Sequence, residues 1–216
     1  MHANATTPIL LLCCGLTLAA NAHAQSLPTV DDFATGPAMV SLTGGDSTTK
    51  QTGSHILGGS RLTQLVFSAN PFHQITEMRI HKGDSQTAPS ALIFSEGFQS
   101  SFMFNLQYGT ANQSLHADLT PYNRFRLHFF GIAGTLNFNI EAYTGTTYSQ
   151  WSCNLNPASG PILVDFPFAD AGGSGANLAA IDQLNFIFQA AGDAVETGLT
   201  EIEFVPASAP PGDVTC

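Results

Sequence analysis

Three segments of the sequence carry polar side chains at every second position: residues 74–82 (QITEMRIHK), 124–130 (RFRLHFF) and 137–143 (NFNIEAY). If the three strands share a sheet, these side chains project to one side. They are Glu77, Arg79, His81, Arg124, Arg126, His128, Asn139, Glu141 and Tyr143. Such groups hydrogen-bond sugar hydroxyls, and an aromatic ring stacks on the apolar face of a sugar. We therefore expect a carbohydrate-binding surface made of Arg79, Arg126, His128, Asn139, Glu141 and Tyr143, with Trp151 at its rim. The alternatives are a wet face of cross-strand ion pairs and a Trp151 that belongs to the core.

Carboxylates on the same surface raise the alternative of a hydrolase that acts on a polysaccharide or an ester. Glycoside hydrolysis needs two carboxyl groups roughly 5 to 10 Å apart. Glu77 with Glu141, or Glu96 with Asp165, are conceivable pairs, but no spacing distinguishes them among the 16 acidic residues. Residues 172–176 (GGSGA) look like a nucleophile elbow, yet they lack its final glycine and its flanking strand and helix. Binding without catalysis is therefore the favoured interpretation.

Other segments also alternate with period two, which indicates strands and not helices. Glycine, proline and asparagine turns separate about ten such segments between residues 30 and 205. Many short strands at regular spacing are typical of an all-β antiparallel sandwich or barrel. On a strand, His73, Glu77 and His81 span about 26 Å, so they cannot bind one zinc ion together.

The N-terminal segment has the layout of a secretory signal peptide. Residues 8–20 are apolar and are followed by Ala22-His23-Ala24, which predicts a signal peptide over residues 1–24. The alternatives are a lipoprotein anchor at Cys13 or Cys14 and a buried N-terminal helix. Removing residues 1–24 leaves Cys153 and Cys216, which can form one disulfide in an oxidising compartment; the alternative is that Cys216 lies unpaired on a frayed end. We expect a secreted protein without a membrane span.

Composition excludes two further classes of protein. The chain has 216 residues and a net charge of −10, and 44% of it is hydrophobic while only 10% is charged. This combination argues against intrinsic disorder. Six scattered Lys and Arg residues cannot make a basic footprint for nucleic acid.

The length suits one domain, assigned to residues 25–205, followed by a proline-rich C-terminal tail (206–216) that we expect to be loose.

The order of several short phrases resembles the galactose-binding-like jelly-roll group of secreted bacterial proteins, which includes carbohydrate-binding modules. The phrases are residues 30–33 (VDDF), 55–61 (HILGGSR), 117–122 (ADLTPY), 163–168 (LVDFPF), 181–184 (IDQL) and 201–204 (EIEF). The resemblance implies a jelly-roll sandwich and sugar binding. It also implies a structural calcium ion near the first and last strands, held here by Asp31 or Asp32 with Glu201 or Glu203, because calcium prefers hard oxygen ligands.

The sequence thus predicts a secreted, single-domain, non-catalytic β-sandwich that binds carbohydrate or another extracellular polymer. A hydrolase that uses carboxylates on the sheet face is the first alternative. A structural surface or matrix protein is the second.

Overall fold

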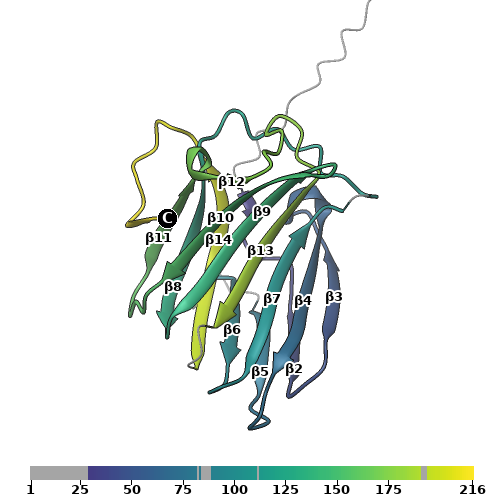
Figure 1. Ribbon diagram of the computed structural model, residues 1–216, viewed down its shortest axis with the longest axis vertical. Helices are drawn as coiled ribbons and strands as arrows, with labels where there is room; N and C mark the ends of the chain where they lie inside the picture. The colour runs from purple at the N-terminus through teal and green to yellow at the C-terminus, as the bar shows by residue number, and fades with distance from the viewer. Residues whose placement is uncertain (1–28, 82, 84–88, 111, 191–193) are drawn as a thin grey trace, which may run out of the picture.

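The strands form two layers, and the predicted all-β jelly-roll sandwich is confirmed (Figure 1). A computed structural model describes residues 29–81, 83, 89–110, 112–190 and 194–216. Three of its fifteen strands are no longer than three residues, and such short strands have no detectable period in the sequence. Two 3-10 turns, Leu57–Gly59 and Phe168–Asp170, complete the elements.

The first layer is called the β8 sheet. Its order is β15 (Val214–Thr215), β11 (Ile162–Pro167), β8 (Arg124–Ala133), β14 (Val195–Val205), β6 (Ala91–Glu96), β5 (Thr76–His81) and β2 (Ala38–Leu42), and β1 (Thr29–Asp31) also pairs with β14. The second layer is called the β9 sheet. Its order is β12 (Gly172–Gly173), β10 (Thr147–Leu155), β9 (Leu136–Thr144), β13 (Gln183–Ala190), β7 (Ser101–Tyr108), β4 (Ser60–Ala69) and β3 (Ser47–Thr52). The pairings are antiparallel except that of β11 with β15.

Aromatic rings fill the space between the two sheets. Phe125 of β8 lies at the centre of this core, with ring centroids 5.2 Å from Trp151 and 5.8 Å from Phe186 of the opposite sheet. Inward positions alternate with outward ones along each strand, as the period-two pattern predicts. The two outer faces of the sandwich therefore carry the polar side chains and point in opposite directions.

A buried polar network also joins the two sheets. Arg61 of β4 and Asp31 of β1 form an ion pair with neither side chain exposed. Tyr108 of β7 donates a hydrogen bond to Asp31 Oδ2 (2.8 Å), and the Phe33 N–H donates to Asp31 Oδ1 (2.8 Å). Arg61 Nη2 donates to the Thr35 carbonyl (3.0 Å). Because the carboxylate and the guanidinium have several partners each, the pair can remain charged inside the core.

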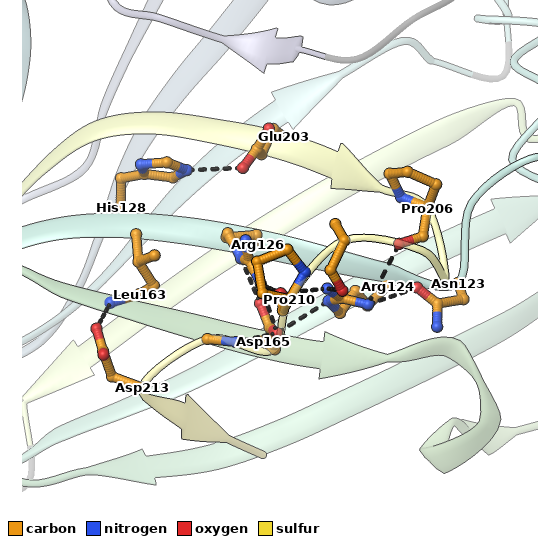
Figure 2. Close-up of polar contacts among 12 residues, drawn as sticks. Asn123, Arg124, Arg126, His128, Leu163, Asp165, Glu203, Pro206, Pro210 and Asp213 are labelled. Carbon is orange, nitrogen blue, oxygen red and sulfur yellow. Dashed lines mark hydrogen bonds and ion pairs between the residues drawn. The ribbon is translucent and has the colours of Figure 1, made fainter.

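The C-terminal residues are held against the outer face of the β8 sheet, so the prediction of a loose tail is wrong (Figure 2). Asp165 of β11 accepts hydrogen bonds from Arg126 Nε (2.7 Å) and from the Gly212 N–H (2.6 Å), and Arg124 Nε lies 2.9 Å from the same carboxylate. Arg124 and Arg126 also donate to the Pro210 carbonyl at 2.8 and 2.7 Å. Although burial opposes ionisation, the hydrogen bonds from Arg126 and Gly212 hold the pKa of Asp165 below its usual value. Prolines supply carbonyl acceptors here, which sequence patterning did not reveal.

The predicted disulfide between Cys153 and Cys216 is present and ties this tail to β10. The predicted signal peptide, residues 1–24, lies outside the described residues. Across the part of the chain that the structure describes, no helix has the length and hydrophobicity needed to cross a bilayer.

Glu96 is a buried carboxyl group at the end of β6. Its side chain is 1% exposed, and its Oε1 accepts the Phe102 N–H at 2.7 Å. Burial raises the pKa of Glu96 to about 7, against the opposing hydrogen bonds from the Phe102 and Ala190 N–H groups. The folded protein therefore holds a proton there that the unfolded chain releases near pH 4.5.

This difference predicts a pH-dependent stability. The raised pKa confers stability that is fully present below about pH 4.5 and is lost as the pH rises toward 7. One pKa unit corresponds to about 1.4 kcal/mol, so the loss amounts to about 3 kcal/mol. Urea unfolding of wild type and Glu96→Gln across pH 4 to 8 measures it, since the variant should lack this component. Parallel pH profiles for the two proteins would contradict the assignment.

Candidate functional site

The side chains predicted to form one ligand surface lie on two opposite faces. β5 and β8 belong to one sheet and β9 to the other. Arg79, Arg126 and His128 therefore project from the outer face of the β8 sheet, whereas Asn139, Glu141 and Tyr143 project from the β9 sheet. The prediction of a shared surface is wrong because alternation reports which side of a strand is buried and not which sheet the strand joins.

The predicted residues of the β8 sheet are engaged with other protein groups. Arg126 is 7% exposed beneath the C-terminal tail, and His128 Nε2 lies 2.8 Å from Glu203 Oε1 (Figure 2). Arg79 is exposed and lies 3.7 Å from Glu77. The partly exposed pair of His128 on β8 with Glu203 on β14 matches the alternative of cross-strand ion pairs on a wet face. Arg79 and Glu77 lie on the same strand, and Arg126 is buried.

Trp151 belongs to the core and forms no rim. Its side chain is 2% exposed, and Nε1 donates to the Pro167 carbonyl at 2.7 Å. Its ring packs edge-on against Phe125. The predicted rim position is therefore wrong, and the core alternative is confirmed.

The four carboxylates predicted to bind calcium do not converge on one point. Asp31 points inward to Arg61 and Tyr108, while Asp32 Oδ2 lies 2.8 Å from His55 Nδ1. Glu201 and Glu203 occupy outward positions of β14, where Glu201 accepts a hydrogen bond from Thr29 and Glu203 contacts His128. Within the described ranges, no three metal-ligating side chains gather. Calcium binding stays a prediction that these four positions do not explain.

The outer face of the β9 sheet carries an array of amide side chains, which we call the amide face. Strand register aligns its outward residues in rows that cross the sheet. One row runs Gln150, Glu141, Asn185, Gln107 and Leu62, and the next runs Ser152, Asn139, Ile187, Asn105 and Gln64. Ten outward amides lie on this face: Gln64, Asn105, Gln107, Asn137, Asn139, Gln150, Asn154, Gln183, Asn185 and Gln189. Glu141 and Lys50 are the charged residues at outward strand positions there.

Hydrogen bonds orient the amides in the middle of this face. Asn185 and Asn105 are only 8% and 7% exposed although they point away from the core. Asn185 Nδ2 donates to Glu141 Oε2 (3.2 Å), and Asn185 Oδ1 accepts from Gln183 Nε2 (3.0 Å). Asn105 Nδ2 donates to Gln64 Oε1 (2.9 Å). Because neighbours fix these side chains, their remaining donors and acceptors are positioned before any ligand arrives.

Two tyrosines form an aromatic pair at one end of the amide face. The rings of Tyr143 and Tyr148 lie 5.9 Å apart at 30° to each other, and both side chains are half-buried. The Tyr143 hydroxyl donates to Glu141 Oε2 at 2.7 Å. Partial burial and this hydrogen bond raise the pKa of Tyr143 to about 12, so the hydroxyl stays a neutral donor.

The sandwich is similar in fold to a family 11 carbohydrate-binding module. That module, from Clostridium thermocellum, was solved with a β-1,3-1,4-mixed-linked tetrasaccharide; it is 11% identical, with a TM-score of 0.50 over 83% of this chain and 95% of the module. The family 11 module of the Clostridium thermocellum cellulase Lic26A-Cel5E is 12% identical, with a TM-score of 0.45 over 80% and 96%. No family model and no curated protein matches the sequence. At this identity the likeness shows the fold alone.

The carboxylate pairs considered for hydrolysis are separated by the fold. Glu77 and Glu141 lie on opposite outer faces. Glu96 points into the core while Asp165 lies under the C-terminal tail. Neither of these two conceivable pairs can therefore serve glycoside hydrolysis, which needs two carboxylates beside one bound sugar.

A serine, a histidine and an aspartate that the sequence reasoning missed meet beside the Tyr143 end of the amide face. Ser114 Oγ donates directly to Asp182 (2.5 Å), and His116 Nδ1 lies 3.2 Å from the same hydroxyl. Asp182 also accepts the Gly145 N–H at 2.8 Å. A hydrolytic triad places the histidine between serine and aspartate. Here the Ser114 hydroxyl donates its hydrogen bond to Asp182 and not to His116, so no histidine is placed to take the serine proton. The cluster therefore connects loops and does not have the arrangement of a catalytic nucleophile.

Proposed function

We propose that the protein binds a neutral polysaccharide on its amide face. The observation that carries the proposal is the row arrangement of ten outward amides next to the Tyr143–Tyr148 pair. An amide group both donates and accepts, so it pairs with a sugar hydroxyl in either role. The tyrosine rings supply apolar surface for the C–H face of a sugar.

The low charge of this face favours an uncharged ligand. A polymer of uronic or sulfated sugars would meet Glu141 without a matching set of arginines and would carry its charge toward a chain of net charge −10. The module of similar fold was solved with a tetrasaccharide, which supports the same chemical class. We further propose that the protein is exported and acts outside the cytoplasm, and the Cys153–Cys216 disulfide supports this.

Pull-down with insoluble polysaccharides tests the proposal. At least one neutral polymer should retain the wild type, and acidic polymers should not. A Tyr148→Ala, Gln150→Ala double variant should bind about thirtyfold more weakly, because each of the two lost contacts contributes roughly 1 kcal/mol. Arg79→Ala, on the opposite face, is the matched control and should bind like wild type.

Two results would overturn the proposal. One is failure of every neutral polymer to retain the wild type. The other is unchanged retention of the double variant while its unfolding transition shows that it is folded. Released reducing ends, measured in the same tubes, would instead support the hydrolase alternative.

A further inference from the structure

A hollow lies on the outer face of the β8 sheet, on the side of the sandwich opposite the amide face. Its volume is about 520 Å³, within the range of small-ligand sites. Its lining comes from the end of β8, the start of β14 and the loop between β10 and β11. We call it the Phe130 hollow, and its lining includes Phe130, Ile132, Ala158, Ser159, Glu196 and Gly198.

The exposed ring of Phe130 rests on Gly198 in the neighbouring strand. The Phe130 residue is 43% exposed. A Cβ added to Gly198 would lie 1.9 Å from two atoms of this ring, so only glycine leaves the ring its place. Glycine weakens a strand interior and often marks a close approach. Gly198 is therefore an unfavourable residue for a strand interior, and it lies at the position where the solvent-exposed ring of Phe130 packs on the sheet.

One wall of the hollow is fixed by backbone pairing. The Ile132 N–H donates to the Ala158 carbonyl at 2.9 Å, and the Ala158 N–H donates back at 2.8 Å. These two bonds attach the loop that carries Pro157 and Ser159 to the end of β8. The wall is therefore in position without a ligand, which lowers the entropic cost of binding.

Two polar groups stand beside the apolar lining. Glu196 is exposed, and the Ser159 hydroxyl belongs to the fixed loop. The Glu196 carboxylate repels anions. A lipid chain that filled the hollow would remove water from this carboxylate, which costs much free energy. A sugar instead presents C–H groups to an aromatic ring and hydroxyl donors to a carboxylate.

We propose that the Phe130 hollow binds a sugar residue of a second polysaccharide chain, so that one protein bridges two chains. The bridging rests on the proposed function of the amide face, because that face holds the first chain. The two sites lie on outer faces that point in opposite directions, and so the two bound chains would not collide. The product would be a cross-linked polymer network with this protein at its junctions.

Binding stoichiometry and a capture assay test the bridge together. Calorimetric titration with a soluble oligosaccharide of the retained polymer should give two sites per chain in wild type. It should give one site in Phe130→Ala and one site of wild-type affinity in the Tyr148→Ala, Gln150→Ala variant. Wild type loaded on the insoluble polymer should capture a fluorescent soluble polymer, and Phe130→Ala and Glu196→Gln should reduce that capture at least tenfold without releasing the protein.

Met39→Ala removes another exposed apolar side chain, from the outer face of β2, and is the matched control that should capture like wild type. One site that survives in Phe130→Ala but disappears in the amide-face variant would overturn the bridge and leave the proposed function standing. One site that disappears in Phe130→Ala but survives in the amide-face variant would locate binding in the hollow. That result would overturn both the bridge and the amide-face proposal. No binding at all would overturn both.

Discussion

Replacing Arg61 with alanine is expected to lower the free energy of unfolding by about 3–5 kcal/mol. Arg61 and Asp31 are fully buried, and the guanidinium is the cation paired with that carboxylate. Its loss would leave Asp31 with hydrogen bonds from Tyr108 and Phe33 only, inside a medium that solvates charge poorly. Urea unfolding at pH 7 measures the change through the transition midpoint.

A double-mutant cycle separates the cost of an orphaned charge from the loss of packing. Asp31→Asn and Arg61→Met each remove one charge, and the double variant removes both. Because the double variant leaves no unpaired charge, it should lose less stability than the sum of the two single variants. Arg79→Ala, which breaks an exposed pair with Glu77, should stay within about 0.5 kcal/mol of wild type. A loss below about 1 kcal/mol in Arg61→Ala would show that the pair contributes little.

The buried pair also shows where sequence reasoning stops. Alternation in residues 60–67 places Arg61, Thr63 and Leu65 on the inward side, so an inward charge is visible in the pattern. Its partner on β1 is 30 residues away in the sequence and comes from the other sheet. Local periodicity carries no information about such a partner, which only the packing of the two layers provides.

The candidate site was predicted only in part, because local periodicity does not reveal which strands are neighbours in a sheet. Asn139, Glu141 and Tyr143 were correctly placed on an outward face, because β9 alternates cleanly. The other amides come from strands whose outward positions can also be read from the sequence, such as Asn105 and Gln107 of β7 and Asn185 of β13. Their union into one face depends on the strand order β10-β9-β13-β7-β4, which joins segments far apart in the chain. The outward amide positions could be read from the sequence, but the strand order that places them on one face could not.

Removing the disulfide is expected to lower the free energy of unfolding by about 4 kcal/mol. Cys153 and Cys216 are 63 residues apart, and the chain-entropy relation gives about this value for a loop of that length. The bond joins β10 of one sheet to the end of the chain beside β11 of the other, so it closes an edge of the sandwich. Losing it should also free the tail, whose Gly212 N–H is a donor to Asp165.

A comparison of the double variant Cys153→Ser, Cys216→Ser with reduced wild type tests this directly. Urea unfolding is measured with and without dithiothreitol. The reductant should lower the free energy of unfolding of wild type to that of the variant and should leave the value for the variant unchanged. Limited proteolysis should then cut residues 206–213 in the variant and in reduced wild type, while the oxidised tail resists cleavage. If the tail stays resistant in the variant, the contacts of Arg124, Arg126 and Asp165 suffice to hold it, and the disulfide acts only on the unfolded chain.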